Sequence, residues 1–153
     1  MNFEGSISIN APREKVWDLL LDVDRFSACV PGIEEVTQVD DRTFDGVILA
    51  TVGPMSGRFS FRAQIVESTA PSEMVTELIG TDSVTKSNVR SFTRMSLAAS
   101  AEEQTQLRYS SAVDIEGRLA ILGDMVMRAT ATLILEEFAN RVRRELEEPA
   151  VGP

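Results

Sequence analysis

The chain has 153 residues, with 24 acidic and 15 basic side chains, a formal net charge of -9, one cysteine and no histidine. Without histidine, Ser-His-Asp and Cys-His catalysis are excluded, and one thiol cannot supply a structural zinc site or an intramolecular disulfide. The acidic balance disfavours nucleic acid as a partner, because phosphate binding depends on clustered Lys and Arg.

The length suits a single globular domain, which we expect to span residues 1–147, with a disordered tail at residues 148–153. The first residues lack the basic and apolar regions of a signal peptide, and no apolar run reaches the ~18–20 residues of a membrane span. We therefore expect a cytoplasmic protein without a direct membrane span.

The N-terminal third predicts a strand followed by two short helices. Residues 3–9 alternate between apolar and polar side chains, which is typical of a half-buried strand. Pro12 suits the first turn of an amphipathic helix that carries Trp17. A second short helix carries Phe26 and ends before Gly32, with Asp22 or Asp24 as its cap.

The middle of the chain predicts strand after strand, separated by short turns. The predicted strands cover residues 33–39, 43–52, 58–66, 74–81, 85–99 and 107–115. Short turns between successive strands favour an antiparallel meander.

The last segment, residues 123–147, contains strong helix formers and predicts one long helix. Its first half is apolar around most of its circumference, so we expect that half to be buried in the concave side of the sheet, and the second half to be more exposed. The predicted order of strand, two short helices, six strands and a long helix indicates an α+β domain in which a curved antiparallel sheet of about seven strands surrounds the helix. Apolar pockets occur in the space between such layers.

These elements resemble the START/Bet v1-like (SRPBCC) superfamily, which has a helix-grip fold. Within it, three stretches resemble the CoxG family, named for the G-subunit of carbon monoxide dehydrogenase: residues 9–17, the Cys-Val-Pro-Gly signature at 29–32, and the Val-Gly-Pro-Met-Ser stretch at 52–56. The segment 117–123, which leads into the long helix, also fits, so that the resemblance covers about residues 3–145.

The resemblance implies a non-catalytic accessory protein, and we expect no cofactor. Such a protein binds an apolar ligand, such as a quinone or a lipid, and accompanies a molybdenum hydroxylase of the carbon monoxide dehydrogenase type, with a link to the membrane. Two alternatives remain open: an enzyme of the cyclase or dehydratase kind on the same fold, using Tyr109, Arg90 or Arg94, and a ligand-free module that recruits a partner protein.

An apolar inward set is the main candidate site. We expect the ligand cavity to be lined by Trp17, Leu20, Phe26, Val30, Leu49, Met55, Phe59, Phe61, Leu78, Phe92, Met95, Met127, Ala131, Ile134 and Phe138. The alternative is that these side chains fill a core that contains no void.

Other candidate sites have simpler explanations. Cys29 lies near the end of a helix without an activating base, which favours packing over reactivity. The acid pairs at residues 22 and 24, 34 and 35, and 40 and 41 fall at predicted caps and turns, which favours capping over metal binding or acid–base chemistry. The stretch 53–57 lacks the phosphate-loop pattern and predicts a hairpin loop, with Met55 as a flexible rim over the pocket.

Two groups of arginines have competing interpretations. Arg90 and Arg94 flank Phe92 on one strand, and we favour solvated arginines with Val89 and Met95 directed inward; otherwise the arginines would bind a polar or anionic head group inside the cavity. The cluster formed by Arg141, Arg143 and Arg144 predicts a solvated helix face with (i, i+4) ion pairs, or else a docking surface for a partner protein. Within the sequence we find no metal-ligand set, and we expect no metal.

Overall fold

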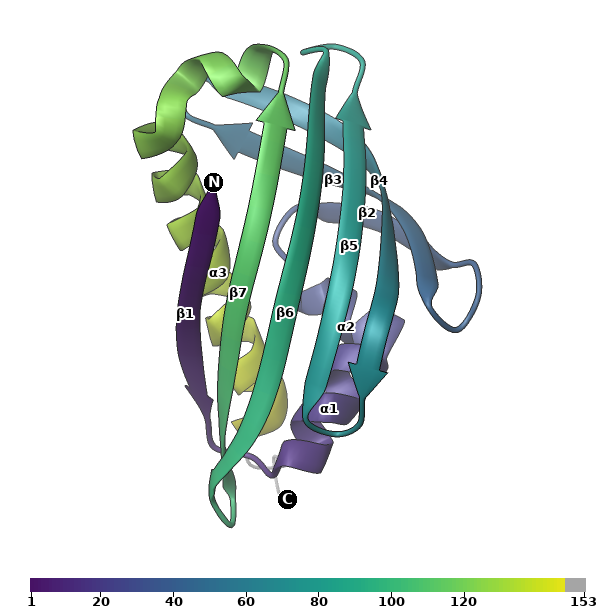
Figure 1. The fold of residues 1–153 in the computed structure, drawn as a ribbon, viewed down its shortest axis with the longest axis vertical. Helices are drawn as coiled ribbons and strands as arrows, with labels where there is room; N and C mark the ends of the chain where they lie inside the picture. Colours follow the sequence, from purple (N-terminus) through teal and green to yellow (C-terminus); the bar gives the residue numbers. More distant parts are fainter. Residues whose placement is uncertain (148–153) are drawn as a thin grey trace, which may run out of the picture.

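The computed structural model describes residues 1–147 as an α+β fold, and the predicted tail at 148–153 lies outside the described residues (Figure 1). The chain begins with β1 (Asn2–Ile9), α1 (Arg13–Leu21) and α2 (Val23–Cys29). Six strands follow: β2 (Ile33–Gln38), β3 (Thr43–Val52), β4 (Met55–Thr69), β5 (Glu73–Asp82), β6 (Ser87–Ala101) and β7 (Gln104–Glu116). The 3-10 helix η1 (Arg118–Leu122) then leads into the long helix α3 (Gly123–Glu147).

The strands form one seven-stranded antiparallel sheet in the order β1-β7-β6-β5-β4-β3-β2. Strands β2 to β7 form a meander, and β1 joins its far edge by pairing with β7. Figure 1 shows that the sheet curls, so that β2 and β3 lie behind the plane of β5, β6 and β7, and α3 lies within the curve. The predicted architecture is confirmed.

The two short helices start where the sequence predicts. The Pro12 carbonyl accepts hydrogen bonds from the backbone N–H groups of Lys15 and Val16, at 3.0 and 3.2 Å, and so begins α1. The Asp22 carboxylate accepts the N–H groups of Asp24 and Arg25 at 3.1 and 3.2 Å, which caps α2. This member of the first acid pair therefore serves as a helix cap.

The buried core consists of two clusters, which lie at opposite ends of the central strands. The base cluster joins α1, the second half of α3 and the adjoining ends of the strands, and includes Ile7, Ile9, Val16, Trp17, Leu19, Leu20, Ile65, Met74, Leu97, Leu107, Ala139 and Val142. The smaller η1 cluster contains Val52, Phe59, Leu119 and Met127. The middle of the sheet lies between these two clusters.

Helix α3 differs from the expected burial pattern. Met125 and Leu133, in its first half, are 85% and 67% exposed, whereas Ala139 and Val142, in its second half, are buried. The prediction that the first half is buried on nearly all sides is wrong. The sheet covers only one side of the helix, and within residues 1–147 the main backbone neighbours of α3 are α2, β1, β3 and η1.

Candidate functional site

The side chains on the concave side of the sheet form what we call the inner face. Phe59 and Ile65 on β4 define it, because they belong to the two core clusters that also contain α3 residues. Side chains of directly paired residues lie on the same side of a sheet, so the register extends this face from β4 to every other strand.

Two rows of inner-face residues cross the middle of the sheet, one of them starting at Ile65 of the base cluster, and we call them the central band. In one row Ala63 pairs with Leu78, which pairs with Ser91, which pairs with Val113. In the next row Ile65 pairs with Thr76, which pairs with Thr93, which pairs with Ser111. Except for Ile65, all of these side chains are only half-buried, so the middle of the inner face keeps solvent-accessible surface beneath α3.

The inner face is almost free of charge. Within residues 1–147, none of the positions that the pairing register directs inward along β1, β3, β4, β6 and β7 carries a charged side chain, and the bulge after Ile65 turns Glu67 outward. Asp82 is the inward exception on β5, and it lies at the end of that strand, where its carboxylate accepts the Val84 N–H at 2.9 Å and the Thr85 hydroxyl at 2.7 Å. The hydrogen bond from Thr85 is the chief reason why the pKa of Asp82 is lowered.

Hydroxyl groups are the main polar feature of the inner face. The Thr93 and Ser111 hydroxyl oxygens are 2.9 Å apart, and the Thr76 hydroxyl donates to the Thr93 carbonyl at 3.4 Å. Tyr109 also faces inward, and its ring crosses β1 at Gly5, where a Cβ atom would come within 2.4 Å of the Tyr109 hydroxyl. Glycine at position 5 therefore leaves room for an inward-facing tyrosine.

Thirteen of the fifteen predicted cavity residues are buried or half-buried. Trp17, Leu20, Phe59 and Met127 are fully buried in the two clusters, while Phe26, Val30, Met55, Phe61, Leu78, Met95, Ala131, Ile134 and Phe138 are half-buried. Phe26 on α2 and Phe138 on α3 meet edge to face, with ring centroids 5.7 Å apart. The fully buried residues act as packing, and the half-buried ones remain candidates for ligand contact.

Leu49 and Phe92 do not share the interior, and their prediction as cavity residues is wrong. They are 47% and 44% exposed, and lie on the outer face of the sheet. Leu49 pairs with the exposed Arg58, and Phe92 pairs with the outward Glu77. In both cases the register, rather than hydrophobicity, decides which face a side chain occupies.

Of the central band, only Leu78 was among the predicted site residues. The apolar Ala63, Ile65 and Val113 were missed, and so were the four hydroxyl residues Thr76, Ser91, Thr93 and Ser111. The alternation of β6 assigned Ser91 and Thr93 to the inward face, but a search for apolar side chains passes over hydroxyls. The signal that identifies them is their position at inward register points in the middle of three neighbouring strands.

The arginines of β6 face outward, as the favoured interpretation predicts. Arg94 pairs with Glu73 and, at 3.8 Å, with Glu67, while Arg90 lies opposite Asp114 on β7. These two arginines cannot bind a head group inside the curve, so the enzyme alternative retains only Tyr109 of its three candidate residues.

The arginines of the basic cluster on α3 are bound by acceptor groups of the same chain. Arg141 donates to Glu137 at 2.9 Å, and its other contact is the Ala28 carbonyl at 3.3 Å. Arg144 contacts the same glutamate at 3.3 Å, and Arg143 donates to the Ser8 carbonyl at 3.1 Å. The ion pairs with Glu137 lower the pKa of that carboxyl, chiefly through the hydrogen bond from Arg141.

Cys29 is a packing residue. The side chain is 3% exposed within the base cluster. Burial raises the pKa of the thiol, and the nearby Glu145 carboxylate raises it further. This environment disfavours the thiolate that nucleophilic chemistry needs.

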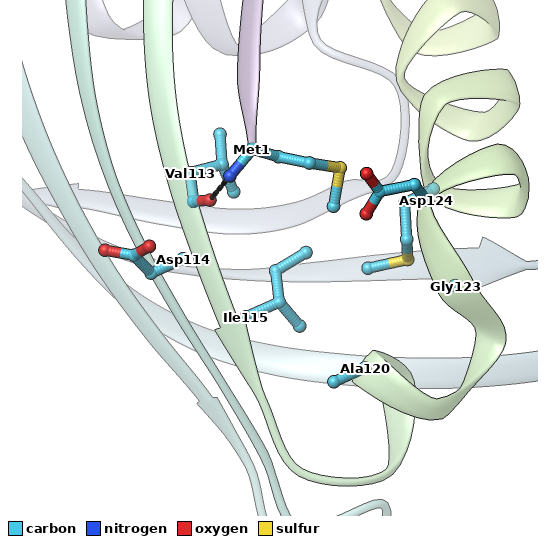
Figure 2. Close-up of a pocket in the computed structure, with 8 residues that line it drawn as sticks. Met1, Val113, Asp114, Ile115, Ala120, Gly123 and Asp124 are labelled. Atoms are coloured by element: carbon cyan, nitrogen blue, oxygen red, sulfur yellow. Dashed lines mark hydrogen bonds between the residues drawn. The ribbon is translucent and has the colours of Figure 1, made fainter.

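A cavity of about 210 Å³ opens between β7 and the start of α3 (Figure 2). It is lined by Met1, Val113, Asp114, Ile115, Ala120, Gly123, Asp124 and Met127. Figure 2 shows the Met1 ammonium group donating to the Val113 carbonyl, at 2.8 Å, with the Met1 side chain extending toward Asp124. Because Val113 and Ile115 belong to the inner face, the cavity adjoins the central band.

A second hollow, of about 430 Å³, lies between α2 and α3. Its lining is Ala28, Glu137, Arg141, Arg144 and Glu145. Four of these five side chains are charged, so this hollow does not suit an apolar ligand.

One protein family matches nearly the whole chain. Residues 5–147 match the model of the CoxG family, which is described as the G-subunit of carbon monoxide dehydrogenase. No curated protein sequence matches the chain. Among residues 1–147, none of the helices combines the length and the apolar character that a membrane span requires.

Solved structures share the fold. A conserved protein from Geobacillus kaustophilus is similar with a TM-score of 0.89 and 20% identity, over 95% of this chain and 94% of that one. A START superfamily protein from Mycobacterium smegmatis is similar with a TM-score of 0.71 and 14% identity, over 95% of this chain and 97% of that one. The Zhui aromatase/cyclase from Streptomyces sp. R1128 is similar with a TM-score of 0.72 and 16% identity, over 100% of this chain and 99% of that one. At these identities the comparison establishes a START/Bet v1-like fold and nothing about activity.

Proposed function

Because the chain belongs to the CoxG family of carbon monoxide dehydrogenase, we propose that it binds an apolar small molecule, quinone-like or lipid-like, between the curved sheet and α3. In this proposal the protein carries out no covalent step. It acts in the cytoplasm as an accessory protein of a molybdenum hydroxylase of the carbon monoxide dehydrogenase type, and the family's name supports that assignment.

The observation that carries the proposal is the uncharged, half-buried middle of the inner face. Phe61, Leu78 and Val113 keep accessible surface there, although they lie on the concave side of the sheet under a helix. Removing apolar surface from water contributes about 25 cal/mol per Å², so a ligand that covers these side chains gains affinity by burial alone. The cavity of 210 Å³ beside β7 is smaller than the usual ~300–1,000 Å³ of small-molecule sites and has Asp114 and Asp124 in its lining, so the proposal assigns the apolar ligand to the central band beside this cavity.

An enzyme on this fold is the rival proposal. Catalysis needs converging polar groups of suitable pKa in the site. Within residues 1–147, the inner face of the central strands offers hydroxyls but no carboxylate or basic side chain, apart from Asp82 at the end of β5. Binding without chemistry is therefore the better-supported proposal.

Extraction of the purified protein, followed by mass spectrometry, tests the proposal. We expect the wild-type protein to retain a quinone or lipid, or to take up added decylubiquinone, in close to one-to-one ratio. Ala63→Phe fills the centre of the inner face and should reduce retention at least about fivefold, because the added ring occupies ligand space.

The control is Ala112→Phe, which places the same ring on the outer face of β7. Both variants are checked for native circular dichroism before extraction. Equal retention by the two variants, or no retained molecule in the wild type even after incubation with decylubiquinone, would overturn the proposal and favour the ligand-free recruitment module.

A further inference from the structure

We infer that Thr93 and Ser111, supported by Thr76, form a polar subsite that holds an uncharged oxygen-bearing group of the ligand and discriminates against carboxylates. The inference rests on the proposed function, and names the chemistry and residues of the same site. The three residues are directly paired neighbours on β5, β6 and β7, at the centre of the inner face.

The hydroxyl pair has unused hydrogen-bonding capacity. Two hydroxyls carry two donor hydrogens and four acceptor lone pairs. The contact of 2.9 Å between Thr93 and Ser111 uses one hydrogen, and both side chains are half-buried rather than sealed in the core. One hydrogen is therefore available to a carbonyl, ether or hydroxyl oxygen of a bound molecule.

The hydrophobic pattern of β6 is inverted at this point. Phe92 faces outward and is 44% exposed, while its neighbours Ser91 and Thr93 face inward. On β7, Ser111 faces inward and Ala112 outward. A sheet that only packed against a helix would direct the phenyl ring inward and the hydroxyls outward, so an inward hydroxyl pair is a feature that packing alone does not explain.

The lack of charge determines the kind of head group. A carboxylate buried here would face hydroxyls, because Arg90 and Arg94 lie on the other side of the sheet. Two cations at the β1 edge already have partners: the Met1 ammonium donates to the Val113 carbonyl at 2.8 Å, and Arg128 lies over the Phe3 ring and donates to the Asn2 carbonyl. An ionised group without a charged partner is costly to bury, whereas a neutral acceptor loses little by exchanging water for a hydroxyl. The subsite should therefore prefer ketone-like or quinone-like oxygens.

Equilibrium dialysis with three probes tests the inference. The probes are decylubiquinone, which is neutral with carbonyl oxygens; dodecylbenzene, which is apolar without oxygen; and dodecanoate at pH 8. We expect wild type to bind decylubiquinone at least about tenfold more tightly than dodecanoate, since an unpaired charge is penalised. The double variant Thr93→Val, Ser111→Ala should weaken decylubiquinone binding about 3- to 10-fold, the size of one or two neutral hydrogen bonds, and leave dodecylbenzene binding unchanged.

The matched control is Thr81→Val with Ser110→Ala, which makes the same substitutions at outward positions of β5 and β7. The control should bind all three probes as wild type does. Unchanged decylubiquinone binding in the inner-face variant, equal loss of dodecylbenzene, or equal affinity for dodecanoate would overturn the subsite while leaving the proposed function intact. If neither decylubiquinone nor dodecylbenzene binds to wild type, the proposed function fails and the subsite fails with it.

Discussion

Asp82 is the one charged residue that is buried among residues 1–147, and its hydrogen bonds explain why it is compatible with an apolar site. The side chain is 4% exposed, and its carboxylate is occupied by Val84 and Thr85 of the turn between β5 and β6. Ser87, the first residue of β6, accepts the Leu119 N–H at 3.1 Å, which ties the start of this strand to η1. The carboxylate therefore stabilises the turn and is not available to a ligand.

This arrangement predicts a pH-dependent stability effect for Asp82→Asn. The pKa of Asp82 is lower in the folded protein, so the carboxylate stabilises the fold above the pKa of the unfolded chain, and this contribution is lost as pH falls through the folded value. We expect the variant to lose about 1–2 kcal/mol at neutral pH, because charged hydrogen bonds become neutral ones, and the difference to shrink below about pH 4.

Urea unfolding of both proteins between about pH 7 and pH 3 measures the effect. Asp41→Asn, at an exposed position in the turn between β2 and β3, controls for the change in net charge. A stability difference that stays constant over the whole range would contradict the role assigned to the Asp82 carboxylate.

At the scale of elements, α3 is held mainly by its second half. Val142 is 1% exposed in the base cluster, and the end of the helix is further fixed by the hydrogen bond of 2.6 Å from the Asn10 N–H to the Glu147 carboxylate. The first half has Met127 buried in the η1 cluster but exposes Met125 and Leu133. The helix is thus anchored at two points, with the central band between them.

Substitutions along α3 should reproduce this asymmetry. Val142→Ala should cost about 2 kcal/mol of unfolding free energy, from lost burial plus a small cavity. Leu133→Ala, at a 67% exposed position, should change stability by less than about 0.5 kcal/mol. Chemical denaturation checks both, and an equal or larger loss at position 133 would show that the first half of the helix is buried in solution.

Strand and helix positions could be largely predicted from the sequence, because local patterns determine them. The predicted strand over residues 43–52 and helix over residues 123–147 coincide with β3 and α3. Strand β4 begins at Met55, three residues before the expected position 58, because the tight turn at Gly53, where φ is +57°, lets Met55 pair directly with Val52. An extension of this kind depends on the partner strand, which the local pattern does not contain.

The face of the sheet on which each side chain lies was harder to predict than the positions of the strands. Leu49 lies in the run from Val47 to Ala50, which is apolar at every position, so alternation alone cannot say which residues face inward. The pairing of Leu49 with Arg58 decides the matter. Phe92 follows the opposite of the usual pattern, because the inward positions beside it hold hydroxyls. Such inversions are expected where a site, rather than a core, occupies the interior.

For the whole molecule, charge and hydrophobicity are divided between the two faces of one sheet. The outer face carries the ion pairs, such as Arg62 with Asp45 at 2.7 Å, whereas the inner face carries apolar side chains and hydroxyls. The formal charge of -9 therefore describes the exterior, and says little about the interior. The proposed ligand chemistry follows from this division: a neutral molecule, mostly apolar, with an oxygen that reaches the hydroxyl pair.

A crystal structure of the protein grown with decylubiquinone tests the central claim most directly. The account predicts ligand density between the sheet and α3, in contact with Phe61 and Leu78, with a quinone oxygen within about 3.2 Å of the Thr93 or Ser111 hydroxyl. An interior filled by side chains, with the quinone absent or bound only on the outer face, would contradict it.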